Sequence, residues 1–189
     1  MQKKVSKMIQ LLERRYPSSK TELIFNTPFQ LLVATILSAQ TTDKTVNKIT
    51  PALFERYKDP SAFAKADIEE LKNAIRGVNY YNTKAKNIKK LAEIIVSRYS
   101  GQIPDTMEEL TKLPGVARKT ANVVLSQGFG KAEGIVVDTH VKRLAERLGL
   151  SRAKTPEKVE EDLMKIIPRE KWISFPFALI LHGRAVCKA

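Results

Sequence analysis

The amino-acid sequence predicts an all-α fold, and two patterns indicate it. Apolar residues recur at the three- and four-residue spacing of a helix face, first in Val5, Ile9 and Leu12. Nowhere do apolar and polar residues alternate for long enough to form a sheet strand. With 189 residues, 43% of them hydrophobic, the chain is long enough for a substantial core. We therefore expect about ten helices and no sheet.

The first part of the chain contains clear signals for three helices. The first is expected at residues 2–15. Thr27-Pro28 supplies an N-cap and a proline in the first turn, and the apolar run 31–37 behind it is typical of a buried central helix. Small polar residues at 38–43 end that run. The next helix should place its apolar residues inward, namely Val46, Ile49, Leu53, Phe54 and Tyr57.

Further capping signals follow in the middle of the chain. Asp59-Pro60 begins a short helix, and Asp67 with Glu70 has the capping-box spacing that opens another. Asn82 is expected to cap a helix over residues 83–98, because its side chain can accept a bond from the first turn. The lysines of that helix are expected to face solvent, namely Lys84, Lys86, Lys89 and Lys90.

The most informative stretch is Leu-Pro-Gly-Val-Ala-Arg-Lys-Thr-Ala at residues 113–121. Pro114 cannot continue the helix that begins after Thr106, and Gly115 tolerates the positive φ of a sharp reversal. A short hairpin should therefore lead into a helix over residues 118–127. The backbone N–H groups of the hairpin loop and of the first turn of that helix lack intrahelical partners, so they can bind a phosphate. The alternative is an ordinary corner between two helices with no ligand. Because Arg118 and Lys119 are adjacent and the whole chain is basic, we favour a phosphate-binding hairpin.

The last third continues the helical pattern. Residues 135–137 form a short apolar extended segment, after which Asp138 opens a helix that runs to residue 149. Thr155-Pro156 caps the next helix. The final helix should reach Cys187, with Pro176 tolerated only in its first turn.

The charge and the cysteine content limit the possible partners and metal sites of the chain. Lysine and arginine number 33 against 20 aspartate and glutamate, which gives a net charge of +13 and favours a nucleic-acid partner over an anionic membrane surface. No apolar run approaches the ~18 residues of a membrane span. Cys187 is the only cysteine, so neither an internal disulfide nor a metal site built from cysteines of this chain alone is possible.

Two residues are candidates for chemistry. The dipole at the start of its helix and the neighbouring Arg118 both disfavour a charged amine on Lys119, which would make it a plausible nucleophile. A surface lysine that contacts phosphate is an equally good interpretation from this pattern alone. Asp138 is equally ambiguous, because a helix cap explains it without catalysis, and one carboxylate can serve in both roles.

Together these residues resemble a known signature. The hairpin at 113–121 and Val137-Asp138-Thr139-His140 are similar to the helix-hairpin-helix, glycine/proline-rich loop and aspartate motif of the HhH-GPD DNA glycosylases, with the endonuclease III family the nearest. Residues 37–43, Tyr81-Asn82-Thr83-Lys84-Ala85 and Leu181-His182-Gly183-Arg184 support the resemblance, which covers nearly the whole chain.

The resemblance implies a two-lobed fold with the active site in the interlobe cleft. A six-helix domain would span residues 21–133, and residues 1–20 would pack with 134–189 as the second domain. Lys119 and Asp138 would face each other across the cleft and form the catalytic pair. The implied partner is double-stranded DNA with a damaged base or an abasic site. We expect a cytoplasmic, nucleoid-associated monomer without a membrane partner.

The resemblance also implies a mechanism. The damaged nucleotide is flipped out of the duplex, and neutral Lys119 attacks C1′ of the sugar, expels the base and leaves a Schiff base. Asp138 stabilises the cationic sugar and helps to deprotonate the lysine, and β-elimination then nicks the strand. Lysine at this position favours the bifunctional branch that removes oxidised pyrimidines. The alternatives are a non-catalytic helix-hairpin-helix DNA-binding module and a monofunctional mismatch glycosylase.

Further DNA contacts are implied at matching positions. Gln40 would fill the space vacated in the DNA stack, and Tyr80 would be a wedge into the opposite strand, where the simpler interpretations are a loop amide and a packed loop aromatic. Ala117 replaces a common second hairpin glycine, which a negative φ would permit. The implied DNA-binding set is Gln40, Tyr80, Leu113, Gly115, Ala117, Arg118 and His140.

Cys187 matches the first of four cysteines that hold a 4Fe-4S cluster in the family. The other three are absent from this sequence. We therefore expect that the intact family protein carries the cluster and that this chain, apparently truncated within the motif, does not assemble it.

Overall fold

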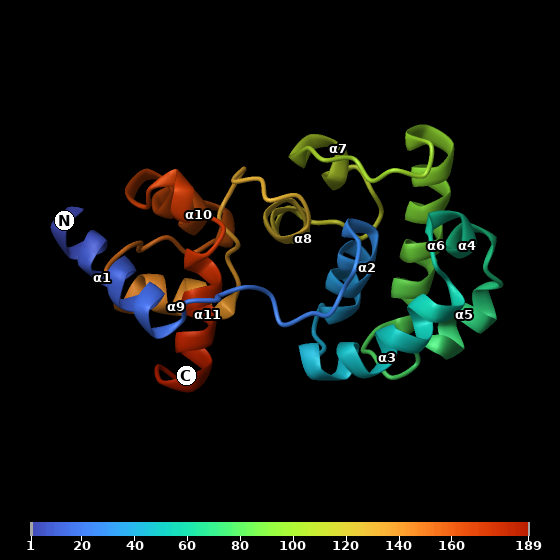
Figure 1. Cartoon of the computed structure of the whole chain (residues 1–189), viewed down its shortest axis with the longest axis horizontal. Helices are drawn as coiled ribbons and strands as arrows, with labels where there is room; N and C mark the ends of the chain where they lie inside the picture. Colours follow the sequence, from blue (N-terminus) through green and yellow to red (C-terminus); the bar gives the residue numbers. More distant parts are fainter. Residues whose placement is uncertain (1, 189) are drawn as a thin grey trace. The chain divides into compact units, whose positions relative to one another are not determined.

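The computed structural model describes residues 2–188, and the part of the chain it describes contains helices and no strand (Figure 1). The helices are α1 (Gln2–Arg15), α2 (Pro28–Ser38), α3 (Asp43–Arg56), α4 (Pro60–Lys65), α5 (Ile68–Ala74), α6 (Tyr81–Tyr99), α7 (Met107–Thr111), α8 (Arg118–Val123), α9 (Thr139–Arg147), α10 (Pro156–Ile166) and α11 (Phe175–Ala185). Val124–Gly128 extends α8 as a π-helical turn, and Arg169–Lys171 is a short 3-10 helix. The all-α prediction is confirmed.

The chain folds into two compact units. One contains Glu22–Phe129, and the other combines the residues up to Thr21 with those from Gly130 onward. We call them the hairpin unit and the terminal unit.

The hairpin unit is built around α2. This helix contacts α3, α6, α8 and the π-helical turn, and its side chains from Leu31 to Leu37 are buried. Thr27 Oγ1 caps it by accepting a bond from the Gln30 N–H at 3.2 Å, and Pro28 occupies its first turn, as the sequence predicts. The apolar run is therefore a central helix because neighbouring helices cover all of its faces.

The terminal unit packs the two ends of the chain together. Helix α11 contacts α1 and α9, and α10 contacts α9. Pro176 lies in the first turn of α11, where its missing N–H has no intrahelical partner to lose. The described core consists of Val5, Ile9, Leu12, Ile135, Val137, Val141, Leu144, Ala145, Val159, Leu163, Ile167, Phe175, Ala178 and Leu179.

Two predictions about α6 are wrong. Asn82 does not cap α6, because the helix already begins at Tyr81 behind Tyr80, whose φ of 57° turns the chain into it. Lys84 does not face solvent but is buried, and Lys89 is half-buried. The helix predicted over residues 118–127 is present, with its second half, Val124–Gly128, wound as a π-helical turn in which Val124, Leu125 and Ser126 are buried.

Candidate functional site

The hairpin is a tight turn between α7 and α8. The Val116 N–H donates to the Leu113 carbonyl at 3.1 Å, and Gly115 has a φ of 78°. With proline second and a positive-φ glycine third, this is the arrangement of a type II turn. A Cβ on Gly115 would also lie 3.0 Å from Asn87 Nδ2. Backbone conformation and crowding therefore both require glycine here.

Lys119 is the second residue of α8 and is exposed. Ala117, at the N-cap, has no side-chain acceptor and makes no capping bond. Its φ of −84° also explains why no second glycine is needed. Arg118 is exposed beside it, whereas the Leu113 side chain is buried and leaves only backbone atoms to face a ligand. The start of α8 thus combines helix N–H groups with two cationic side chains.

Asp138 is the N-cap of α9. Its Oδ1 accepts a bond from the Val141 N–H at 2.8 Å, and its side chain is half-buried. The capping role is therefore real, and the second carboxylate oxygen is bonded to none of the residues in 2–188. Asp138 belongs to the terminal unit and Lys119 to the hairpin unit.

His140, the second residue of α9, contacts Arg143. Arg143 Nη2 lies 3.2 Å from His140 Nδ1 and is also within hydrogen-bond distance of the Cys187 carbonyl at 2.8 Å and the Gly183 carbonyl at 3.1 Å. A Cβ on Gly183 would lie 3.1 Å from His140 Nδ1. Glycine in the Leu181–Arg184 motif therefore permits the close approach of α9 and α11.

Gln40 and Tyr80 lie in two loops of the hairpin unit and are both exposed, Tyr80 by 67%. Both adopt positive φ, 55° and 57°. Asn79 joins the loops: its N–H donates to Thr41 Oγ1 at 3.1 Å, and its side-chain amide donates to the Gln40 carbonyl.

Lys84 is a residue that sequence reasoning missed. Its side chain is only 5% exposed, and its Nζ donates to the carbonyls of Leu37 and Ala39 at 2.7 and 2.6 Å. Burial lowers the pKa of Lys84. Its position within the Tyr81–Ala85 motif was the only signal that it differs from the solvent-facing lysines of the same helix.

Cys187 does not fit an iron–sulfur cluster by itself. Its Sγ accepts a bond from Arg147 Nη1 at 3.1 Å, and no group of three or more His, Cys, Asp or Glu side chains in 2–188 is arranged to hold a metal ion. Cys187 is the only cysteine of the sequence, whereas such a cluster takes four protein ligands.

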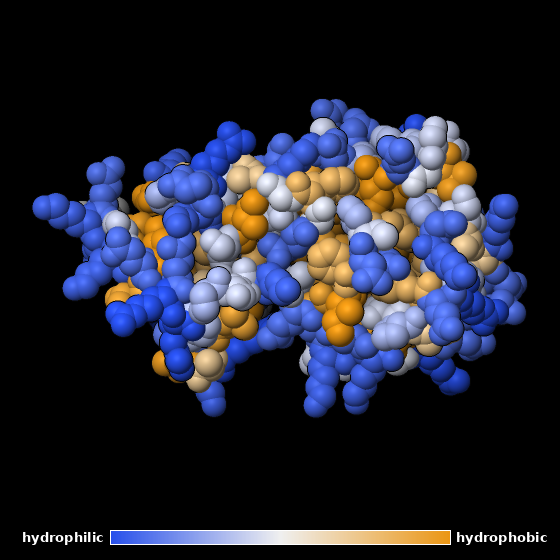
Figure 2. All heavy atoms as spheres, in the orientation of Figure 1, coloured by the Kyte–Doolittle hydropathy of each residue, from blue (hydrophilic) through white to orange (hydrophobic). Residues whose placement is uncertain are grey.

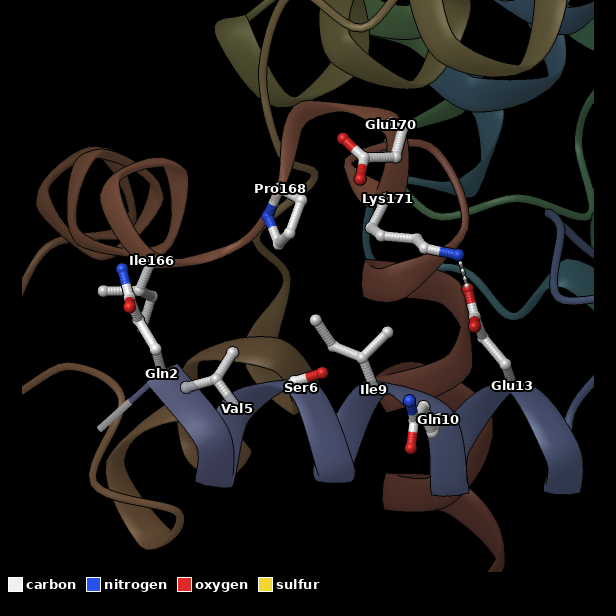
Figure 3. A pocket seen from close by; sticks show the side chains of 10 residues that line it. All are labelled: Gln2, Val5, Ser6, Ile9, Gln10, Glu13, Ile166, Pro168, Glu170 and Lys171. Atoms are coloured by element: carbon white, nitrogen blue, oxygen red, sulfur yellow. Dashed lines mark hydrogen bonds and ion pairs between the residues drawn. The ribbon is translucent and has the colours of Figure 1, made fainter.

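A hollow of about 480 Å³ in the terminal unit does not contain any of the predicted site residues (Figure 3). It lies along α1, with Val5 and Ile9 on that helix and Pro168 among the residues that line it. Its charged members are Glu13, Glu170 and Lys171, of which Glu13 and Lys171 bind each other at 2.6 Å. We therefore assign it no ligand.

Figure 2 shows hydrophilic side chains over much of the visible face, with smaller apolar areas between them. Among residues 2–188, no helix has the length and apolar character needed to cross a membrane.

Comparison with known proteins gives one consistent result. A sequence profile of the HhH-GPD superfamily base excision DNA repair proteins matches residues 33–169. Endonuclease III of Synechocystis sp. is 51% identical over 98% of this chain and 85% of its own length. The structure of a trapped endonuclease III–DNA covalent intermediate is 43% identical, with a TM-score of 0.94 over 100% of this chain and 89% of that chain. A non-covalent endonuclease III–DNA complex is also 43% identical and gives a TM-score of 0.95.

Proposed function

The chain belongs to the endonuclease III family within the HhH-GPD superfamily of base excision DNA repair proteins, and from this premise we propose that Lys119 and Asp138 are its catalytic residues. The protein is a bifunctional DNA glycosylase and AP lyase, and its partner is duplex DNA that contains a damaged base. The observation that carries the assignment of Lys119 is its place directly after the type II turn, at the start of α8.

The chemistry begins with the neutral amine of Lys119. Its nitrogen forms a bond to C1′ of the sugar while the bond from C1′ to the base breaks, and the bonding electrons leave with the base. Positive charge develops on the sugar in this step, and the carboxylate of Asp138 stabilises it. The nitrogen bonded to C1′ then loses a proton, and its lone pair breaks the C1′–O4′ bond, with O4′ taking up a proton, which opens the sugar ring and gives a protonated Schiff base. Loss of a proton from C2′ then expels the 3′ phosphate by β-elimination, and water releases the lysine.

DNA binding is assigned to three parts of the chain. The backbone N–H groups of Gly115 and Ala117 and the side chain of Arg118 contact phosphates, and Leu113 closes the turn that presents them, because its carbonyl accepts from the Val116 N–H at 3.1 Å. Gln40 and Tyr80 occupy the space that the flipped nucleotide leaves. The ring of His140, whose Nδ1 lies 3.2 Å from Arg143 Nη2, contacts a phosphate through Nε2.

The substrate class is oxidised pyrimidines. A duplex oligonucleotide that carries thymine glycol tests this, with an 8-oxoguanine duplex as the control. We expect strand cleavage without alkali, an unsaturated aldehyde at the 3′ end of the product, and much slower reaction on the control. A product that breaks only after alkali would instead indicate a monofunctional glycosylase. Intact DNA that is nevertheless bound would indicate a non-catalytic module.

A further inference from the structure

Two loops with unusual backbones adjoin in the hairpin unit. Within residues 2–188, Gln40, Tyr80 and Ser100 are the non-glycine residues with positive φ. The side chains of Gln40 and Tyr80 are the ones proposed to occupy the space that the flipped nucleotide leaves in the DNA. Asn79 links their two loops by hydrogen bonds to Thr41 Oγ1 and to the Gln40 carbonyl. Residues other than glycine rarely adopt a positive φ unless the surrounding structure imposes it.

The buried ammonium of Lys84 makes the contacts that hold the Gln40 loop in this conformation. Its three N–H donors all have partners: the Leu37 carbonyl at 2.7 Å, the Ala39 carbonyl at 2.6 Å and Thr41 Oγ1 at 3.4 Å. The two carbonyls lie at the end of α2, which is the negative end of its dipole. None of the three partners is a carboxylate. Thr41 Oγ1 also accepts from Asn79, so one hydroxyl connects the buried ammonium to both loops.

We propose that Lys84 is a positioning residue for DNA opening, which holds the Gln40 and Tyr80 loops as one preformed unit. This inference rests on the proposed function, because it assumes that these loops enter the duplex. Their conformation is then established in the free protein, before DNA binds. Removal of the ammonium frees residues 39–41 to relax, which slows nucleotide flipping and leaves the chemistry at Lys119 unchanged.

Lys89→Met is a matched control for Lys84→Met. Lys89 lies one turn further along α6 and also caps the end of a helix: its Nζ donates to the carbonyls of Ala64 and Ala66 at 2.9 and 2.6 Å. These carbonyls lie at the end of α4 and not beside the Gln40 loop. Both variants should unfold at a lower temperature than the wild type, so lost stability alone cannot explain a difference between them.

The experiment compares two substrates and one spectroscopic signal. Single-turnover cleavage is measured on a thymine glycol duplex, where a base must be flipped, and on single-stranded DNA with an abasic site, where none is stacked. A 2-aminopurine beside the lesion reports unstacking by its fluorescence. We expect Lys84→Met to slow the duplex reaction by about tenfold or more, to reduce the fluorescence rise, and to cleave the single strand within about twofold of wild type. Lys89→Met should match the wild type in all three.

Equal losses of Lys84→Met on both substrates, or equal behaviour of the two variants, would overturn the proposal. Asn79→Ala provides a second variant if Lys84→Met does not fold, because Asn79 is exposed and its side chain contributes only the loop-to-loop bond. It should show the same pattern in milder form, and wild-type behaviour would overturn the proposal. Failure of wild type to cleave either DNA would refute the proposed function, while the fluorescence comparison would still test Lys84.

Discussion

At the scale of single residues, Asp138 combines two roles that can be separated. One oxygen caps α9 through the Val141 N–H, and the negative charge is proposed to stabilise the sugar cation. A cap of this kind contributes about 1 kcal/mol to the free energy of unfolding. Asparagine caps a helix about as well as aspartate but carries no charge.

Asp138→Asn should therefore leave the free energy of unfolding within a few tenths of a kcal/mol of wild type and reduce the single-turnover rate by about a hundredfold or more. Asp138→Ala should lose the same rate and about 1 kcal/mol of stability in addition. Urea denaturation and cleavage of an abasic-site duplex measure the two effects. An unchanged rate in the asparagine variant would mean that the residue is only a cap.

Caps could be predicted from the sequence, and buried lysines could not. Thr27, Asp59 and Thr106 cap their helices as expected, because a cap depends on residues two or three apart in the chain. Lys84 points inward because the end of α2, more than forty residues away, supplies its acceptors. The bond from Asn79 to Gln40 is equally long-range, so the coupling of the two loops was also invisible in the sequence.

At the scale of elements, the hairpin shows how backbone conformation and packing together require a glycine. Gly115 has a φ of 78° and lies against Asn87, whereas Gly101 has a φ of 81° with nothing within 4 Å of a Cβ. The motif at 113–121 predicts the reversal and the positive φ because both are properties of a Pro-Gly pair. It does not predict Asn87, which comes from α6.

Gly101→Ala should lose about 1–2 kcal/mol of unfolding free energy, because it places a Cβ in the left-handed region. Gly115→Ala should lose more, because its Cβ also meets Asn87. Only Gly115→Ala should also weaken binding to an undamaged duplex, since it displaces the hairpin N–H groups. Fluorescence anisotropy with labelled DNA measures this difference. Equal affinity of the two variants would exclude the hairpin from the DNA interface.

At the scale of the whole molecule, charge governs association. The chain carries a net charge of +13, and binding to a duplex releases counterions from every phosphate that a lysine or arginine neutralises. The excess of basic residues is visible in the composition. Which of them reach phosphates is a property of the folded surface, and the lysines divide accordingly: Lys84 is buried, Lys112 is paired with Glu108 and Glu109, and Lys119 is exposed.

The logarithm of the affinity for undamaged duplex should fall linearly with the logarithm of salt concentration, by about 0.9 for each phosphate contact. Arg118→Gln should reduce the steepness of that line by about one contact. Anisotropy titrations between low and physiological salt provide the slopes. A flat dependence would argue against phosphate contacts as the source of affinity.

Lys119 as the nucleophile is the central claim, and Lys112 provides its control. Both lysines flank the hairpin, but hydrogen bonds to Glu108 and Glu109 raise the pKa of Lys112 and so favour its protonated form, which is not a nucleophile. The most direct measurement is borohydride trapping on abasic-site duplex DNA. Wild type and Lys112→Gln should become covalently linked to the DNA, whereas Lys119→Gln should bind the duplex but give no linked product. Trapping by Lys119→Gln at the wild-type level would contradict the account.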